Sequence, residues 1–462
     1  MPALPTACVI GAGSSGIAGA KALKERGIEF DCFEASDRVG GNWVFGNRNG
    51  MSSAYRDLHI NTSRERMEYS DFPMPKSYPD FPHHTQIAEY FDAYVDHFGV
   101  REHIHFETAV QRAERRPDGV WEVTVEGGET RRYDAVIVAN GHHWDPRWPE
   151  PAFPGQFDGE VLHAHHYVEA DGWKGKRVVV LGMGNSAMDI AVEASYVADR
   201  VFLAARRGAW IIPKYFAGVP LDQLALRGDR VAKMLSDPRL PWALQQKLLE
   251  ATFKRAVGGD MTAYGLPQPD HRIGEAHPTV SGRILDRITH GAVTPKPNIA
   301  ELRGDRVAFA DGSEEEADVI VYCTGYKVTF PFFDEDFISA PGNDLPLFRR
   351  VFHPEIGGVA FLALLQPLGA IMPLAEAQGR WIAHWLRGEY HLPGHDAMVA
   401  EIAADREAMF KRYVASKRHT MQVDFDRYLH ELAREVKRGG RRAREAGFAS
   451  QVPARASSLA AA

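Results

Sequence analysis

One arrangement of glycines occurs twice in this sequence, each time between an apolar run and a helical pattern. The two copies are Gly11-x-Gly13-x-x-Gly16 and Gly182-x-Gly184-x-x-Ala187. They follow predicted strands at Ala7–Ile10 and Arg177–Leu181. In this context glycine permits a tight turn, close approach of the backbone to a pyrophosphate, and close packing of the helix whose N-terminus faces the phosphates. We therefore expect an α/β fold with two Rossmann-like dinucleotide-binding domains.

The first fingerprint continues in a way that favours FAD. A second predicted strand ends at Glu34, at the distance where a carboxylate bonds a ribose diol. The paired glycines in RVGGNW, residues 38–43, resemble the second FAD contact of flavoproteins that have two dinucleotide sites. The residues expected to bind FAD in this part of the chain are Gly11, Gly13, Ser15, Gly16, Glu34, Gly41, Asn42 and Trp43.

The second fingerprint favours NADPH. The strand predicted at 201–205 is followed by Arg206 and Arg207, close to where a ribose-binding acid would otherwise stand. Two guanidinium groups suit a 2′-phosphate, which a carboxylate would repel. A surface pair of arginines is the alternative. The residues expected to bind NADPH here are Gly182, Gly184, Asn185, Ser186, Ala187, Asp189, Arg206 and Arg207.

An FAD site followed by an NADPH site indicates hydride transfer from a nicotinamide to a flavin. The electrons can then pass to a disulfide, a quinone, an electron-transfer protein or oxygen. A disulfide reductase needs a dithiol beside the flavin, and the three cysteines, Cys8, Cys32 and Cys323, include no CxxC pair. We therefore expect neither a redox dithiol nor a bound metal.

The connector between the two fingerprints carries a pattern that bears on the acceptor. Phe157-x-Gly159-x-x-x-His163-x-x-x-Tyr167 matches the FxGxxxHxxxY pattern of flavin-containing monooxygenases, with Val168 where Lys or Arg is usual. Baeyer–Villiger relatives end the same pattern with Trp followed by Pro or Asp. Further similar segments are HINTSRERMEYSDFPMP, VIVANGHHWDP, GMGNSAMDIA, RRGAW, VIVYCTGYKVTFPF and LQPLGAIMPLAEAQGRW. The chain thus resembles the flavin-containing monooxygenase family over nearly its whole length.

This resemblance implies an NADPH- and O2-dependent flavin monooxygenase. In such an enzyme NADPH reduces FAD, oxygen adds to give a C(4a)-hydroperoxide, and NADP⁺ stays bound to protect it. A soft nucleophile, an amine nitrogen or a sulfide sulfur, then takes up the distal oxygen. A Baeyer–Villiger enzyme acting on ketones and an uncoupled NADPH oxidase or redox sensor stay open as alternatives. A disulfide or quinone reductase is disfavoured.

The resemblance also implies roles for individual residues. Asn61, in the segment INTS, is expected to donate an amide hydrogen bond near the reactive edge of the flavin, with Thr62 as a cofactor contact. The alternative for Asn61 is a cap on a local turn. Thr324 and Gln366 are further expected cofactor contacts. The connector motif is expected to link the two domains, and direct catalysis by its His or Tyr is the alternative.

The expected order of domains places the NADPH domain inside the FAD domain. Residues 1–168 form the first FAD segment, 169–324 the NADPH domain, and 325–462 the second FAD segment with C-terminal helices. A stretch at about 215–290 interrupts the βαβ pattern with helical periodicity and is expected to be an insertion.

Composition limits the partners. The chain has 462 residues and a net charge of −7, so a general attraction to nucleic acid or anionic membranes is not expected. No signal peptide or membrane anchor is apparent, which predicts a cytoplasmic protein. The expected partners are O2 and a small nucleophilic substrate. A homodimer is also an expectation, because the family often dimerises. The sequence does not name the substrate.

Overall fold

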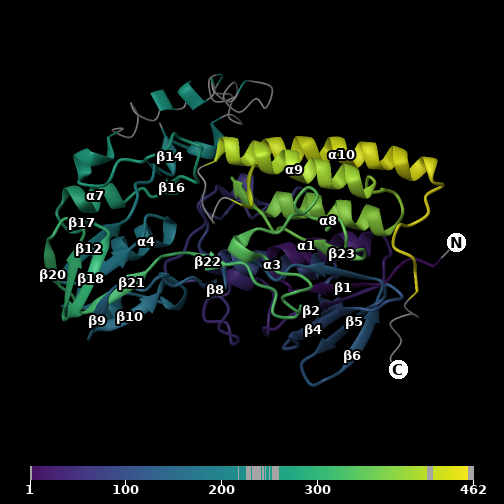
Figure 1. The fold of residues 1–462 in the computed structure, drawn as a ribbon, viewed down its shortest axis with the longest axis horizontal. Coiled ribbons are helices and arrows are strands. Elements are labelled where there is room, and N and C mark those ends of the chain that lie inside the picture. The colour runs from purple at the N-terminus through teal and green to yellow at the C-terminus, as the bar shows by residue number, and fades with distance from the viewer. Residues whose placement is uncertain are drawn as a thin grey trace. The chain divides into compact units, whose positions relative to one another are not determined.

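The computed structural model describes residues 3–216, 218–224, 230, 241, 244, 246–248, 250–251, 260–413 and 420–455. The chain divides into two compact units (Figure 1). The first contains Met1–Ser52, Arg64–Asp145 and Lys327–Ala462, and the second contains Ser53–Ser63 and Pro146–Tyr326. The second unit therefore lies within the sequence of the first.

The borders of these units differ from the expected ones at 168/169 and 324/325. The second unit already begins at Pro146, because the connector adds a strand, Glu160–His163, to the sheet of that unit. It also includes Ser53–Ser63, a segment that we call the strap. The strap lies in the middle of the first expected FAD segment, and no local pattern marks it as part of the other unit. Which dinucleotide each unit binds stays a prediction at this point.

The first unit is built on a parallel sheet of five strands in the order β23-β7-β1-β2-β3. The strands are β1 (Ala7–Ile10), β2 (Phe30–Phe33), β3 (Ile104–His105), β7 (Ala135–Val138) and β23 (Val359–Phe361). Each position of β1 and β7 is buried, as expected for parallel strands that are covered on both faces. The predicted strand Ala7–Ile10 is confirmed.

Helices cover one face of this sheet and a second sheet covers the other (Figure 1). The helices α1 (Ser14–Glu25) and α8 (Met372–Leu386) approach closely, because a Cβ on Gly379 would lie only 3.1 Å from the Cα of Gly19. The opposite layer consists of the antiparallel strands β4 (Val110–Arg115), β5 (Trp121–Val125) and β6 (Thr130–Tyr133). Trp121 of this layer packs with Val136 and Phe361 of the parallel sheet in one hydrophobic core.

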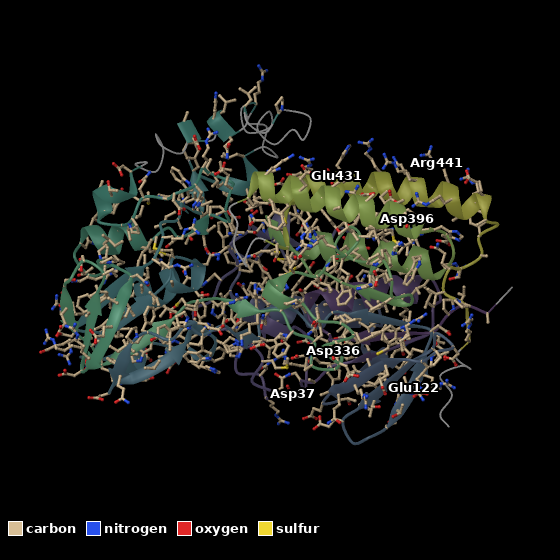
Figure 2. All side chains as sticks on the ribbon, viewed as in Figure 1. Asp37, Glu122, Asp336, Asp396, Glu431 and Arg441 are labelled. Carbon is tan, nitrogen blue, oxygen red and sulfur yellow. The ribbon has the colours of Figure 1, made fainter. Side chains whose placement is uncertain are left out.

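The remaining elements of the first unit are mostly helical. They are η1 (Gly41–Trp43), α2 (Arg64–Met67), α3 (His84–His97), η2 (Arg101–His103), η7 (Pro341–Asn343), β24 (Gln366–Leu368), α9 (His395–Arg412), β25 (Gln422–Asp424) and α10 (Phe425–Glu445). Helix α10 buries Tyr428 and Leu432, whereas Arg441 points into solvent (Figure 2). In the part of the chain that the structure describes, no helix is both long and apolar enough to span a membrane.

The second unit has its own parallel sheet of five strands, in the order β10-β21-β11-β12-β17. The strands are β10 (Glu160–His163), β11 (Arg177–Leu181), β12 (Arg200–Ala205), β17 (Thr294–Pro297) and β21 (Val319–Tyr322). Strand β11 alternates in the usual way, so that Val178 and Val180 face one core and Val179 and Leu181 face the other. Helix α4 (Asn185–Ala194) covers the first of these faces.

Shorter elements complete the second unit. They are β9 (Gly155–Phe157), η3 (Ala164–His166), η4 (Asp171–Trp173), β13 (Ile211–Ile212), β14 (Tyr215–Phe216), β15 (Val219–Pro220), η5 (Leu221–Gln223), η6 (Met261–Tyr264), β16 (Thr279–Val280), α7 (Ile284–Thr289), β18 (Ile299–Gly304), β19 (Arg306–Phe309) and β20 (Glu314–Glu316). Two further strands, β8 (Asp145–Pro146) and β22 (Tyr326–Lys327), include the residues where the chain passes from one unit to the other. Much of the expected helical insertion at about 215–290 lies outside the described residues.

Candidate functional site

The first glycine fingerprint forms a tight loop that leaves no room for a side chain at Gly11 or Gly16. A Cβ on Gly16 would lie 1.8 Å from the carbonyl oxygen of Gly11, so helix α1 begins directly against the loop. Gly11 has a φ of +103°, which favours glycine. Gly41, from RVGGNW, lies against the same loop, because its Cβ would lie 3.2 Å from the Cα of Gly13. The structure therefore brings together the two segments that the sequence assigns to FAD.

The side chain of Glu34 hydrogen-bonds to the backbone of this loop. Its carboxylate accepts the backbone N–H of Ala12 at 2.7 Å and that of Ser36 at 2.8 Å. Burial raises the pKa of Glu34, while these N–H donors oppose the rise. A carboxylate offers about four acceptor positions. Two backbone donors thus leave capacity for a ribose diol, although the structure also gives Glu34 a role in shaping the loop.

The other residues expected to bind FAD make few side-chain hydrogen bonds in the structure. Asn42 donates from Nδ2 to the carbonyl of His143 at 3.3 Å. Trp43 ends the short helix η1 and is half-buried. Ser15 and Gln366 are also half-buried, and within the described residues neither side chain makes a hydrogen bond. The structure therefore places these four side chains in the first unit, but their contacts do not by themselves indicate a binding role.

The second fingerprint repeats the same geometry. Gly182 has a φ of +147°, and a Cβ on it would lie 2.7 Å from the carbonyl oxygen of Cys323. Gly184 caps helix α4 in an extended conformation. Asn185 Oδ1 accepts the N–H of Val280 at 2.8 Å, which fixes the first residue of the helix. Ser186 and the buried Ala187 follow in the first turn, where the N–H groups of a helix N-terminus suit an anion.

The two arginines after β12 are not equivalent. Arg207 pairs with the carboxylate of Asp270, with Nε and a terminal nitrogen at 2.7 and 2.6 Å from Oδ2. Arg206 is exposed and has no ion pair or hydrogen bond to another described residue. An exposed ion pair contributes little free energy, so the pair with Asp270 leaves Arg207 able to bind an anion. Arg206 is the guanidinium that has no competing carboxylate.

The connector motif wraps the edge of the second sheet. Strand β10 pairs in parallel with β21, so that Glu160 lies opposite Val319. Before the strand, Phe157 packs into the core on one face of the sheet, and after it Tyr167 is buried in the core on the other face. Gly159 is required at the bend, since its Cβ would lie 2.5 Å from the carbonyl oxygen of Asp318 and 2.7 Å from the Phe157 ring.

His163 occupies the centre of the motif as a buried, neutral imidazole. Its ring centroid lies 5.6 Å from that of Trp148 and 5.5 Å from that of Tyr326. Its Nδ1 accepts the N–H of His165 at 3.1 Å, which caps the short helix η3. Burial lowers the pKa of His163 to about 4. These contacts account for the histidine through packing and local hydrogen bonding.

Helix α4 presents two half-buried carboxylates to two tyrosines. The hydroxyl of Tyr167 donates to Glu193 at 2.6 Å, and the hydroxyl of Tyr55 donates to Asp189 at 2.5 Å. Burial raises the pKa of Glu193 to about 7, and it also raises that of Asp189. In the structure the Asp189 carboxylate accepts the hydroxyl of Tyr55 from the strap, and the expected contact of Asp189 with NADPH stays a prediction.

The strap places Asn61 and Thr62 between fixed backbone groups. Lys214 Nζ donates to the carbonyl of Ile60 at 3.0 Å, and the N–H of Ser63 donates to Asp222 at 2.7 Å. Asn61 and Thr62 themselves are half-buried, and their side chains make no hydrogen bond to any described residue. Local sequence patterns do not reveal Tyr55, Lys214 or Asp222 as supports, because all three contacts are long-range.

Thr324 is used within the second unit. Its hydroxyl donates to the carbonyl of Arg147, and the N–H of Arg147 donates to the carbonyl of Gly325 at 2.9 Å. These bonds hold the end of β21 at the point where the chain leaves the unit. All three cysteines are free thiols. Across the described residues, no group of His, Cys, Asp or Glu is arranged to hold a metal ion.

A family model described as flavin-binding monooxygenase-like matches residues 6–440. The chain belongs to the flavin-binding monooxygenase-like family. This monooxygenase is 40% identical over 440 residues to flavin-containing monooxygenase 5 of Rattus norvegicus, with 92% of the chain and 81% of the relative covered. It is 36% identical over 444 residues to dimethylaniline monooxygenase [N-oxide-forming] 2 of the same organism, with 93% and 82% covered.

A solved structure shares the fold of this monooxygenase. S-allyl-L-cysteine S-oxygenase from Allium sativum superimposes with a TM-score of 0.69 at 24% sequence identity, covering 94% of this chain and 88% of that protein. The fold class expected from the two fingerprints, with two Rossmann-like domains, is thereby confirmed.

We predict that Gly159→Ala destabilises this monooxygenase by about 1–3 kcal/mol, because the new methyl group meets a backbone carbonyl and a packed ring. Urea unfolding would measure the loss. Gly172→Ala is a matched control, since a Cβ there has nothing within 4 Å. Equal stability of the two variants would contradict the tight bend at Gly159.

A second prediction concerns pH. Because the pKa of Glu193 is raised to about 7 in the fold from an ordinary value of 4.5, the folded state binds the proton more tightly than the unfolded state. The contribution of Glu193 to stability is therefore largest below pH 4.5 and declines as the pH rises through about 7. Thermal melting of the wild type against Glu193→Gln should show the variant gaining in relative stability from pH 5 to pH 8. A constant difference over this range would contradict a protonated Glu193.

Proposed function

We propose that this monooxygenase uses NADPH and O2 to oxygenate soft nucleophiles, amine nitrogens or sulfide sulfurs, at a bound FAD. When bound, the flavin takes two electrons from NADPH and delivers them to O2, so that one oxygen atom enters the substrate and the other leaves as water. Family membership supports the reaction class. The names of an N-oxide-forming relative and of an S-oxygenase with the same fold support the substrate class.

The first fingerprint has the features that an FAD pyrophosphate needs. The contact of Gly16 with the carbonyl of Gly11 brings the N-terminus of α1 to the surface of the loop, where unpaired N–H groups attract an anion. Glu34 lies at the end of the adjacent strand with acceptor capacity to spare for a ribose diol. In this assignment Gly41, Asn42 and Trp43 provide the second contact with the cofactor.

The second fingerprint suits NADPH for related reasons. Gly182, Gly184 and the first turn of α4 present the same backbone donors to a pyrophosphate. Arg206 would bind the 2′-phosphate, because its guanidinium is exposed, stands directly after β12 and faces no carboxylate in the described structure. Arg207 would contribute less, since Asp270 already pairs with it.

The observation that carries the catalytic assignment is the state of Asn61. Its neighbours are fixed through the carbonyl of Ile60 and the N–H of Ser63, while its own amide makes no hydrogen bond within the described chain. An amide in this state is preorganised to donate to a reacting group. It is also neutral, so it would donate a hydrogen bond beside a bound flavin without supplying a titrating proton. We therefore assign Asn61 as the catalytic residue.

We predict that Asn61→Ala keeps oxidising NADPH but releases most of the electrons as H2O2, because one stabilising donor is lost. The yield of sulfoxide from methyl phenyl sulfide, or of N-oxide from dimethylaniline, should fall about tenfold or more per NADPH. Asn298→Ala is a matched control, since Asn298 is a half-buried amide of the same unit with no side-chain hydrogen bond to a described residue.

Three outcomes of this measurement would contradict the proposal. Equal product yields for wild type and Asn61→Ala would remove Asn61 from catalysis. Complete conversion of NADPH to H2O2 by the wild type with both substrates would favour an oxidase. When the same assay is run with a ketone as a third substrate, an ester formed without any sulfoxide or N-oxide from the other two would favour Baeyer–Villiger oxygenation.

We predict that Arg206→Ala raises the KM for NADPH by about tenfold or more while the KM for NADH stays the same, because only NADPH carries the 2′-phosphate. Arg207→Ala should have a smaller effect in the same direction, since Asp270 already engages its guanidinium. Steady-state kinetics with both nicotinamides would measure the ratio. A ratio that does not change in either variant would exclude both arginines as 2′-phosphate ligands.

A further inference from the structure

The strap 53–63 carries the proposed catalytic Asn61 and is built into the second unit through three polar anchors. The first is the hydroxyl of Tyr55, which donates to Asp189 of α4 at 2.5 Å. The second is Lys214, between β13 and β14, whose ammonium donates to the carbonyl of Ile60 at 3.0 Å. The third is Asp222, in η5, which accepts the N–H of Ser63 at 2.7 Å. Three separate elements of the second unit thus hold one short segment.

Apolar packing supports the same attachment. Tyr55 is only 4% exposed and belongs to the core that contains Met188 of α4. Its ring centroid lies 5.8 Å from that of Tyr167, the last residue of the connector motif. The N–H of Arg56 donates to the carbonyl of Val168 at 2.9 Å, so the strap and the connector are also joined through their backbones.

The charges of Lys214 and Asp189 also favour each other. Burial lowers the pKa of Lys214 and raises that of Asp189, and in both cases the opposite charge of the other residue opposes the shift. Both groups are half-buried, where a charge that lacks compensation is costly. Ile60 and Ser63 of the strap are themselves fully buried.

We infer that Lys214, Tyr55 and Asp189 are positioning residues for Asn61, and that the second unit sets the place of this amide through them. Lys214 is the most direct of the three, because the carbonyl it holds belongs to the residue before Asn61. This inference rests on the proposed function for the role of Asn61, whereas the anchoring itself stands on the contacts of the strap. None of the three side chains needs to touch a cofactor.

Hydrogen–deuterium exchange of the purified protein without added NADPH tests the anchoring independently of turnover. Exchange of the strap amides should accelerate about tenfold in Lys214→Met and in Tyr55→Phe, because each change removes a partly buried hydrogen bond to a charged or carbonyl group. Tyr133→Phe is the matched control, since it removes a tyrosine hydroxyl that donates to Asp31 at 2.6 Å in the first unit. This control should lower thermal stability and leave exchange in the strap unchanged. Unchanged exchange in both anchor variants would overturn the inference.

Coupling of NADPH oxidation to product then tests the consequence for Asn61. In Lys214→Met and Tyr55→Phe the share of NADPH that ends as H2O2 should rise several-fold toward that of Asn61→Ala, with the KM for NADPH within about twofold of the wild type. A general loss of stability does not predict a rise in H2O2 at a nearly unchanged KM for NADPH. The control Tyr133→Phe should therefore stay coupled.

The two measurements separate the failure of this inference from the failure of the proposed function. Suppose that Asn61→Ala does uncouple the enzyme. Faster exchange of the strap amides in the anchor variants, with unchanged coupling, would then overturn the positioning role. If Asn61→Ala stays coupled, the proposed catalytic role of Asn61 fails and the positioning role fails with it, while faster exchange would still establish Lys214 and Tyr55 as structural anchors of the strap.

Discussion

The pairing of β10 with β21 at the edge of the second sheet is the constraint on which the candidate site depends. This pairing fixes which way the chain faces before and after the strand, so that Phe157 enters one core and Tyr167 the other. A slip of one residue would turn each side chain of the strand to the opposite face. The connector motif therefore packs against both faces of the sheet around its edge strand. This packing explains why its aromatic residues and its glycine stand at fixed spacings.

The position of the connector also determines which polar side chains helix α4 needs on the face that meets it. Asp189 and Glu193 lie four residues apart and so share one face of the helix. Moving a carboxylate partly out of water is costly unless it is hydrogen-bonded, and each of these two half-buried carboxylates accepts a tyrosine hydroxyl. Tyr167 comes from the connector and Tyr55 from the strap, and both bury a ring while satisfying a polar tip. One helix face thus receives two segments that are more than a hundred residues apart in the chain.

Local patterns predicted the parts of this molecule that depend on neighbours in sequence. The strands Ala7–Ile10 and Arg177–Leu181 were predicted with the bounds that the structure has, because an apolar run ending in a glycine turn determines them locally. The fate of individual polar side chains was not predictable in this way. Asp189 pairs with Tyr55, and Thr324 donates to the carbonyl of Arg147. Such contacts join segments that only the folded chain brings together, and the unit borders differ from expectation for the same reason.

Asn61 shows how a long-range contact can decide between two readings of one residue. An asparagine that caps a turn spends its side-chain oxygen on a backbone N–H two residues on. In the structure the N–H of Ser63, two residues on, donates instead to Asp222. Lys214 donates to the carbonyl of Ile60, so the backbone groups on both sides of this pair of residues are bonded without the Asn61 amide. The entropy of ordering this segment is then lost during folding rather than during the reaction, and an amide held in this way is available to a bound group.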